Sequence, residues 1–416
     1  MSGRCVSRPD RLPTDPITTD CPRTPSAART PEETLSAAPH SPAAHRPLDV
    51  ESTADDRDQW PLGTFVDAVE TSLRDFVATQ QATVDSVGPI YTDAVAELTS
   101  FVFRGGKRIR PAFAWTGFLG AGGDPHAVGA DAVLDVCSAL EFVQACALVH
   151  DDIIDASSTR RGFPTVHVTF AERHRAAGWR GNSDKFGESV AILLGDIALC
   201  WADDLVRAAA LNSATSARLA PVWSAMRTEV LGGQLLDIAV EASGDDSVEA
   251  ALQIDRYKTA AYTVERPLLI GGTLAGAGPD LLEVYSTFGA DIGIAFQLRD
   301  DLLGVFGDPS VTGKPSGDDL REGKRTVLLA AALDAADERD PATAAALRAG
   351  IGTDLSEAAV DDLRAHMIDL GAVDDVERRI TTLTDSALAA LNASDVTEDA
   401  KRRLTAMAYT ATRRTS

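Results

Sequence analysis

The sequence predicts an all-α fold, a helical bundle, and three observations support this. Ala and Leu are abundant while aromatic residues make up only 6% of the 416 residues, a balance that favours helices over sheet sandwiches. Apolar residues recur at helical spacing, first at Phe65, Val66, Val69 and Leu73. Few segments show the alternation of apolar and polar residues that marks a half-buried strand.

The chain divides into a polar tail and one helical domain. Residues 1–58 are rich in Pro, Ser, Thr, Ala and Arg and lack hydrophobic periodicity, so we expect them to be disordered. Residues 59–416 read as one domain of helical stretches separated by Gly and Pro. Within it we expect a loop from Gly304 to Gly317, and three further amphipathic stretches after Arg325.

Bulk properties exclude several classes of protein. The formal net charge of -23 argues against a nucleic-acid-binding surface, which needs clustered Lys and Arg. The five cysteines are not closely paired, so neither a zinc motif nor a disulfide framework is indicated. No apolar segment approaches an uninterrupted membrane span. We expect a cytoplasmic protein with no transmembrane segment.

The most informative stretch places carboxylates beside guanidiniums. Asp151, Asp152 and Asp155 follow an apolar run and precede Arg160 and Arg161. On a helix, residues four apart lie on one face, so the carboxylates of Asp151 and Asp155 would converge on one point. Hard oxygen ligands suit Mg²⁺ bridging to a phosphate, and guanidiniums match phosphate oxygens. The stretch therefore predicts a diphosphate site.

A second carboxylate site is predicted at Asp300 and Asp301. Adjacent aspartates elsewhere in the chain are mostly expected to be solvated surface, but this pair follows an apolar run, and carboxylates in apolar surroundings need a partner or a metal. Gln297 lies one turn before Asp301 and can reach the same face, unless it is a buried amide bonded to a neighbouring helix. Two such sites in one chain suggest a facing pair.

Basic residues cluster in glycine-bearing stretches. Lys107, Arg108 and Arg110 follow two glycines and lead into a helix at Pro111, an arrangement that suits an anion, although an isolated match would more often be a solvated turn. Lys324 and Lys314 lie in a mixed-charge loop that could close over a phosphate.

Lys258 and Thr259 lie in a weakly polar helix and could bind a leaving group. On its own, such a lysine more often snorkels to the surface. His150 is expected to orient the neighbouring aspartates rather than to act as a base.

Taken together, these segments resemble the trans-isoprenyl diphosphate synthases, or polyprenyl synthetases. The resemblance spans about Phe103 to Thr326, and the matching blocks, in order, are GGKRIRP, HDDIID, RRGFPTVH, KTAAYT, FQLRDDLLGVFGD and GKPSGDDLREGKRT. It implies an isoprenoid synthase-type helical bundle around a central cavity, a homodimer, and Mg²⁺-dependent head-to-tail condensation of isopentenyl diphosphate with an allylic diphosphate.

The resemblance also implies roles for individual residues. The Mg²⁺ ligands correspond to Asp151, Asp155 and Asp300, with Asp152 and Asp301 in support. The allylic diphosphate would be contacted by Arg160, Lys258 and Lys314, and isopentenyl diphosphate by Lys107, Arg110 and Arg161. Thr259 and Gln297 lie where the family stabilises the developing cation, and the departing diphosphate is expected to take the proton.

Two positions depart from the family pattern. Gln144 stands where relatives often have His, and it can still donate to a phosphate without adding charge. Gly304 stands where many relatives have a third aspartate, which leaves the second metal site to Asp300 and Asp301.

The residues before Asp151 bear on product length. On the same helical face as Asp151, Ala147 lies one turn upstream and Val143 or Gln144 lies two turns upstream. The fifth residue upstream of Asp151 is Cys146. These side chains are smaller than the aromatic residues that limit the product of some relatives to fifteen carbons. We therefore expect a deeper cavity, with Phe142 at its end. This predicts geranylgeranyl diphosphate, the twenty-carbon product, as the main product.

Other functions stay open at this stage. A longer-chain polyprenyl diphosphate is the alternative product. A class I terpene cyclase would ordinarily carry a different second metal motif and would need no isopentenyl diphosphate site. A non-catalytic subunit of a heteromeric synthase would typically lack aspartates from one cluster, whereas both are present here.

Overall fold

The computed structural model describes residues 57, 59–308 and 317–413, which belong to one compact unit, Ser52–Ser416. The predicted disordered tail, residues 1–58, lies outside the described residues except for Arg57. Arg57 pairs with Asp131 at 2.6 Å, and its guanidinium lies 5.6 Å from the centroid of the Trp60 ring.

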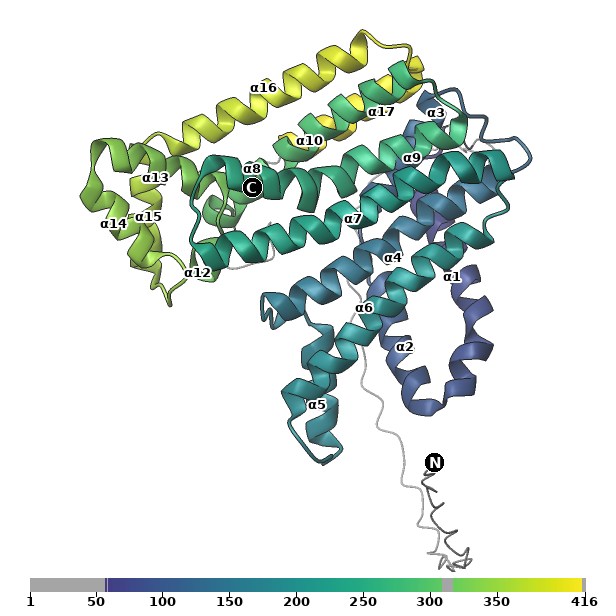
Figure 1. The fold of residues 1–416 in the computed structure, drawn as a ribbon, viewed down its shortest axis with the longest axis horizontal. Helices are drawn as coiled ribbons and strands as arrows, with labels where there is room; N and C mark the ends of the chain where they lie inside the picture. Colours follow the sequence, from purple (N-terminus) through teal and green to yellow (C-terminus); the bar gives the residue numbers. More distant parts are fainter. Residues whose placement is uncertain (1–56, 58, 309–316, 414–416) are drawn as a thin grey trace, which may run out of the picture. The chain divides into compact units, whose positions relative to one another are not determined.

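The all-α prediction is confirmed, because apart from one very short hairpin the regular structure of the described residues is helical (Figure 1). The elements are α1 Leu62–Val87, α2 Pro89–Phe103, α3 Ile109–Gly120, α4 Ala130–Ile154, β1 Thr159–Arg160, β2 Phe163–Pro164, α5 Val166–Ala176, α6 Ser183–Ala208, α7 Ser213–Ser243, α8 Val248–Ile254, η1 Asp255–Glu265, α9 Arg266–Ala275, α10 Pro279–Phe306, α12 Asp318–Glu322, α13 Val327–Arg339, α14 Pro341–Gly350, α15 Glu357–Asp369, α16 Ala372–Asn392 and α17 Glu398–Thr412.

Local sequence explains many of the helix ends. Asn182, Asn212 and Ser247 accept backbone N–H bonds at the first turns of α6, α7 and α8, which satisfies donors that have no partner within the helix. Gly244 and Gly276 adopt left-handed conformations after α7 and α9, where a side chain would be unfavourable.

Helix α4 lies between α6 and α7 in Figure 1 and packs extensively against α6. The predicted apolar stripe of α1 packs against α4, and Phe65, Val69 and Leu73 are buried there. Among the described helices, α4 is the one long and apolar enough to cross a membrane, yet 78% of its apolar window is buried inside the protein. Its hydrophobicity is accounted for by this burial.

Helices α13, α14 and α15 gather at one end of the bundle, at the left of Figure 1, while α16 runs beside α10 and α17. Five helices follow Arg325 within the described residues rather than the three predicted. The prediction of a loop from Gly304 was also wrong at its start, because α10 continues to Phe306 and buries Val305. The apolar residues that follow Asp301 keep the end of α10 packed.

Candidate functional site

The first acidic site lies at the carboxyl end of α4. Asp155 caps the helix, and its N–H donates to the Asp151 carbonyl at 2.8 Å, so the two residues are one turn apart as predicted. Ala156 then adopts a left-handed conformation with φ of 50°, which ends the helix. Partial burial and the nearby charge of Asp151 raise the pKa of Asp155 to about 6.

A two-residue hairpin brings Arg160 back to these aspartates. Arg161 and Gly162 both have positive φ, 54° and 78°, and form the tight turn between β1 and β2. Arg160, in β1, donates from Nη2 to Asp151 Oδ2 at 3.0 Å and from Nε to Asp152 Oδ1 at 2.6 Å. Asp152 is fully buried, so its carboxylate supports the site by holding Arg160.

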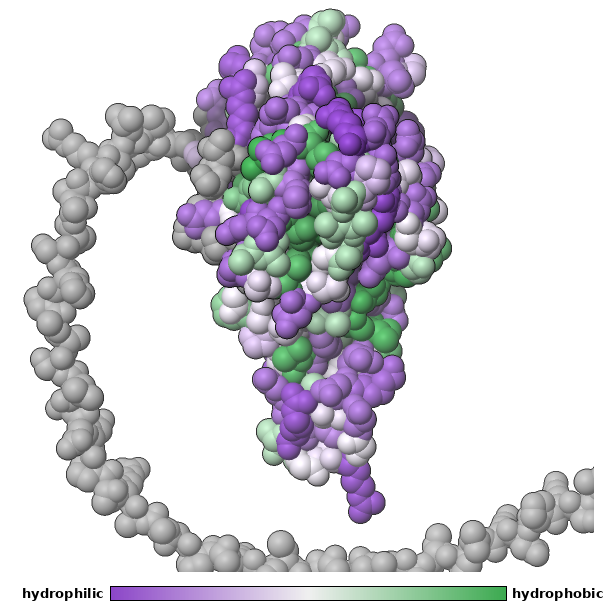
Figure 2. Space-filling model, turned by 90° about the vertical axis from the view of Figure 1, so that its left-hand side faces the viewer, coloured by the Kyte–Doolittle hydropathy of each residue, from purple (hydrophilic) through white to green (hydrophobic). Residues whose placement is uncertain are grey.

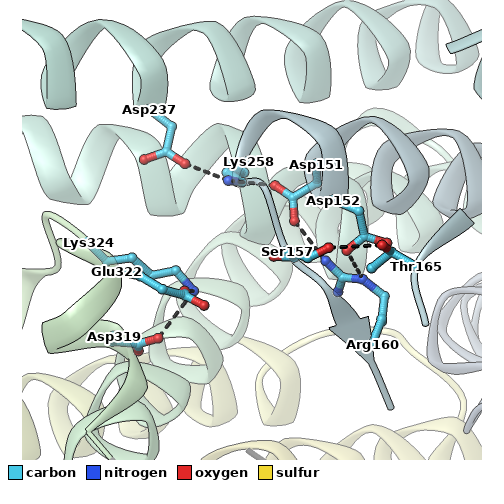
Figure 3. A network of polar contacts seen from close by, with 10 residues as sticks. All are labelled: Asp151, Asp152, Ser157, Arg160, Thr165, Asp237, Lys258, Asp319, Glu322 and Lys324. Atoms are coloured by element: carbon cyan, nitrogen blue, oxygen red, sulfur yellow. Dashed lines mark hydrogen bonds and ion pairs between the residues drawn. The ribbon is translucent and has the colours of Figure 1, made fainter. Parts of the chain in front are cut away.

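Lys258 lies on the other side of Asp151 (Figure 3). Its Nζ is 3.1 Å from Asp151 Oδ1 and also donates to Asp237 Oδ2. Lys258 therefore does not snorkel to solvent. Although burial alone would raise the pKa of Asp151, Lys258 and Arg160 hold it below the ordinary value. Asp237 was missed in the sequence, where the only signal was a carboxylate one helical turn after Gly233.

The backbone around Lys258 is unusual. Lys258 and Thr259 lie in η1, a π-helix of 11 residues between α8 and α9. Pro267 at the start of α9 lacks an N–H and so cannot donate within the helix. Gly233 of α7 lies against this segment, since a Cβ at position 233 would be 2.3 Å from the backbone nitrogen of Lys258. Close packing on glycine thus brings Asp237 and Lys258 together.

The second acidic site is built on α10. Thr259 Oγ1 donates to Gln297 Oε1, and Gln297 Nε2 donates to Asp301 Oδ1, both at 2.8 Å. Gln297 therefore shares a face with Asp301, as predicted, and also bonds to the neighbouring helix. Asp301 is 3% exposed, and burial together with the charges of Asp319 and Asp300 raises its pKa.

Lys324 links the two sites electrostatically. Its charge acts on Asp151 and Asp155 of the first site and on Asp301 of the second. Its Nζ pairs with Asp319 at 3.1 Å and Glu322 at 3.0 Å. Figure 3 shows this group across a gap from the Lys258 and Arg160 group. That the two acidic sites face each other stays a prediction, which the influence of Lys324 on the carboxylates of both sites supports.

A third group of cations surrounds the loop between α2 and α3. Arg161 Nη1 donates to the Gly105 carbonyl at 3.0 Å. Arg110 donates to Thr263 Oγ1 at 2.9 Å, and its guanidinium lies 3.9 Å from the centroid of the Tyr262 ring. Lys107 is exposed on the same loop. The structure therefore brings Arg161 to the glycines beside Lys107. Both residues must lie at this loop if they bind the same anion.

Arg108 does not belong to this anion site. It is buried, with Nη1 2.5 Å from Glu141 Oε2 and Nη2 3.1 Å from Glu70 Oε1, and it also donates to the Val102 carbonyl. The prediction of three cations at this loop was wrong in this respect. The helix also starts two residues earlier than predicted, at Ile109, because Arg108 adopts the left-handed conformation that begins α3.

The donor set fits a divalent cation. Asp301 Oδ2 is a buried oxygen without a hydrogen-bond donor among the described residues, and carboxylate oxygens are the ligands that Mg²⁺ prefers. Within that part of the chain no three carboxylate, imidazole or thiolate groups already converge as a metal cage. A metal held at this gap would therefore complete its coordination with oxygen atoms of water or of the diphosphate.

The sequence profile of the polyprenyl synthetase family matches residues 92–365. This segment contains both acidic sites and the cations Lys107, Arg110 and Arg161. The chain belongs to the polyprenyl synthetase family. It is therefore a prenyltransferase, and the family expectation drawn from the ordered blocks is confirmed.

Relatives of this synthetase include proteins named as isoprenyl diphosphate synthases. It is 34% identical over 282 residues to the geranylfarnesyl diphosphate synthase of Aeropyrum pernix, covering 66% of this chain and 79% of that one. Its fold is similar to a geranylgeranyl pyrophosphate synthase from Corynebacterium glutamicum complexed with isoprenyl diphosphate and magnesium, with a TM-score of 0.81 and 49% identity over 86% of this chain and 100% of that chain. A geranylgeranyl pyrophosphate synthetase from Pyrococcus horikoshii gives a TM-score of 0.70 at 25% identity, covering 84% of this chain and 98% of that chain.

Of three other predicted residues of the synthetase, one lies outside the described residues, one lies where it was expected and one is placed differently. Lys314 lies outside the described residues. Gln144 is half-buried on α4, two turns before Asp151 and on the same face. His150 points toward α6, where its Nε2 lies 3.1 Å from the Ile192 carbonyl and Gly195 leaves room for the ring. It therefore joins two helices and does not orient the aspartates.

Proposed function

We propose that the protein condenses isopentenyl diphosphate with an allylic diphosphate, head to tail and with Mg²⁺, mainly to geranylgeranyl diphosphate. The observation that carries this proposal is the Asp237–Lys258–Asp151–Arg160 network facing Lys324 and Asp319. It combines oxygen ligands for a metal with cations for a diphosphate. The separate group of cations Lys107, Arg110 and Arg161 would bind a second diphosphate.

In this proposal the aspartates hold the metal and the cations hold the leaving group. Asp151, Asp155 and Asp300 would bind Mg²⁺, with Asp301 behind them. When bound, Mg²⁺ would supply positive charge to the oxygens of the departing diphosphate. Arg160 and Lys258 bind further diphosphate oxygens, and stabilisation of this kind is worth about 10²–10³ in rate per donor.

The hydrogen-bond chain from Thr259 fits the developing carbocation. Because Thr259 gives its hydroxyl proton to Gln297, and Gln297 is fixed by Asp301, the Thr259 oxygen keeps its lone pairs for a positive neighbour. The alkene of isopentenyl diphosphate would then attack the carbocation. We assign the final proton to the departing diphosphate.

The twenty-carbon product is supported by the packing below the first acidic site. Cys146 and Val143 are buried and small, and Ala147 is half-buried. One turn beyond Cys146, the Phe142 ring contacts Phe76 of α1 and Trp201 of α6, with centroids 5.6 and 5.7 Å away. Small residues followed by an aromatic stop favour an intermediate chain length. The small residues alone would favour the longer-chain alternative.

Incubation with Mg²⁺, isopentenyl diphosphate and separate allylic starters tests the activity. Chromatography of the dephosphorylated products should show the twenty-carbon alcohol as the main species. Release of diphosphate without isopentenyl diphosphate would support a terpene cyclase instead. A dominant fifteen-carbon alcohol would contradict the deep cavity.

We further propose that the enzyme acts as a homodimer in the cytoplasm. On α7, Leu231, Leu235 and Ile238 are 53%, 66% and 39% exposed and share one helical face. Ile192 and Leu193 of α6 are exposed as well, and apolar (green) side chains also appear among hydrophilic ones on the face seen in Figure 2. Such stripes are typical of interfaces between protein chains. Light scattering should give twice the chain mass, and Leu235→Glu should shift the protein toward monomer.

The proposed catalytic domain is residues 59–416. A chain that begins at Ser52, where the compact unit begins, should keep the prenyl transfer activity of the full chain. Loss of activity on this truncation would show that the N-terminal residues contribute to the reaction.

A further inference from the structure

Gly304 leaves a space on the acidic face of α10 that another residue fills. Residue 304 lies one turn after Asp300 and three residues after Asp301, so a side chain there would project beside both carboxylates. A Cβ at Gly304 would lie 1.7 Å from Asp319 Oδ2 and 2.4 Å from Asp319 Cγ. The carboxylate of Asp319 thus occupies the volume that a side chain at position 304 would take.

The surroundings of Asp319 connect it with the second acidic site. Asp319 is the second residue of the short helix α12, which packs on α10, and its side chain is 13% exposed. Its charge acts on Asp301, whose Oδ2 is buried without a hydrogen-bond donor among the described residues. The other close partner of Asp319 is Lys324.

We propose that Asp319 is the third carboxylate of the second acidic site, supplied by α12 in place of a side chain at Gly304, and that it helps Asp300 and Asp301 to hold the divalent cation. Gly304 is needed because any side chain there would collide with this carboxylate. The inference rests on the proposed function, but it concerns metal binding and can be tested separately.

A purely electrostatic alternative is that Asp319 only orients Lys324. The two roles predict different metal binding. If Asp319 contacts the metal or its water, removing its charge weakens Mg²⁺ binding even without a phosphate ligand. If it acts only through Lys324, then Asp319→Asn and Lys324→Gln should have the same effect on Mg²⁺ binding.

The test is calorimetric titration of the full chain with Mg²⁺, with and without inorganic diphosphate. Asp319→Asn and Asp319→Ala should weaken Mg²⁺ binding by about 10–100-fold, as loss of a supporting ligand typically does. Asp318→Asn is the matched control, since it removes the same charge one residue away, and should change binding less than about threefold. Lys324→Gln should leave Mg²⁺ binding unchanged or strengthen it, because it removes a nearby positive charge.

The decisive variant moves the carboxylate to the other helix. Gly304→Asp combined with Asp319→Ala places one carboxylate back in the same space, from α10 instead of α12. This double variant should bind Mg²⁺ within about fivefold of the parent chain, whereas Asp319→Ala alone should not. Thermal unfolding shows whether each variant is folded.

Unchanged Mg²⁺ binding in both Asp319 variants, or no recovery in a folded double variant, would overturn the proposal. Failure of the proposed function looks different. In that case the parent chain would form no prenyl diphosphate, while the Mg²⁺ titrations would still decide the role of Asp319.

Discussion

The Nζ atom of Lys258 lies 3.1 Å from Asp151 Oδ1, on a carboxylate that also accepts a hydrogen bond from Arg160. Both cations that are proposed to bind the diphosphate are therefore engaged with a proposed metal ligand. Mg²⁺ must compete with them for Asp151, and a diphosphate relieves the competition by drawing the cations away. Binding of the metal and of the diphosphate should consequently be coupled, each strengthening the other.

Lys258→Gln tests this coupling. Without diphosphate, the variant should bind Mg²⁺ more tightly than the parent chain, by about tenfold, which corresponds to ~1.4 kcal/mol. Prenyl transfer should nevertheless fall by about 10²–10³-fold, because a cation on the leaving group is lost. Calorimetry and product assays measure the two effects. Lys185→Gln, which removes a surface lysine paired with Glu188, should change neither.

Arg108 should affect stability rather than substrate binding. Its guanidinium is 2% exposed and pairs with Glu141, itself 5% exposed. Arg108→Gln leaves a buried carboxylate without its partner, so the free energy of unfolding should fall by about 3–5 kcal/mol. Urea unfolding measures this loss. The neighbouring exposed Lys107 provides the control. The Lys107→Gln variant should have the same free energy of unfolding as the parent chain and a higher KM for isopentenyl diphosphate. Equal stability of the two variants would contradict the buried role of Arg108.

Asp301 should make the metal-free protein less stable as the pH rises. Burial raises its pKa in the folded protein above the ordinary carboxyl value, so the folded state binds a proton that the unfolded state has lost. Stability from this group is therefore full below the ordinary carboxyl pKa of about 4 and declines as the pH rises toward the raised value. Asp301→Asn removes the effect and keeps the bond from Gln297.

Urea unfolding without metal, from about pH 5 to about pH 8, tests this expectation. The variant should gain stability relative to the parent chain as the pH rises, and Mg²⁺ should stabilise the parent more than the variant, by favouring the ionised carboxylate of Asp301. A difference between the two proteins that does not change with pH would show that Asp301 is ionised throughout.

Much of this architecture could be predicted because it depends on local patterns. Helical periodicity predicted α1, and the spacing of Asp151 and Asp155 predicted their shared face. Other features depend on residues far apart in the sequence. Arg108 looks like its neighbours Lys107 and Arg110 in the sequence, and only its left-handed backbone conformation, φ of 47°, turns it into the core.

Distant packing also explains the residues that sequence reasoning missed. Asp237 reaches Lys258 because Gly233 lets α7 lie against η1, a contact between segments with no local signal. In the same way, Gly304 looked like the loss of a carboxylate, whereas α12 brings Asp319 into that space. His150 was assigned by its position beside the aspartates, but the room left by Gly195 directs its ring to α6.

Phe142 should set the length of the product. Its position on α4 lies nine residues before Asp151, or about 13.5 Å by helical rise, and its ring forms a closed group with Phe76 and Trp201, whose own ring centroids are 6.0 Å apart. Phe142→Leu should remove part of this floor and shift the main product beyond twenty carbons. Ala147→Phe should place an aromatic ring above the floor and shorten the product.

Phe118→Leu provides the matched control for Phe142→Leu. Phe118 is a buried aromatic residue of the same hydrophobic core, but it packs on Trp115 of α3, with centroids 5.5 Å apart, away from the residues below Asp151. Both Leu variants should lose comparable stability, about 1–3 kcal/mol, and only Phe142→Leu should change the products separated by chromatography. If both variants lengthen the product, general loosening of the core is responsible. If neither does, the growing chain follows another path than the face of α4 that carries Cys146 and Phe142.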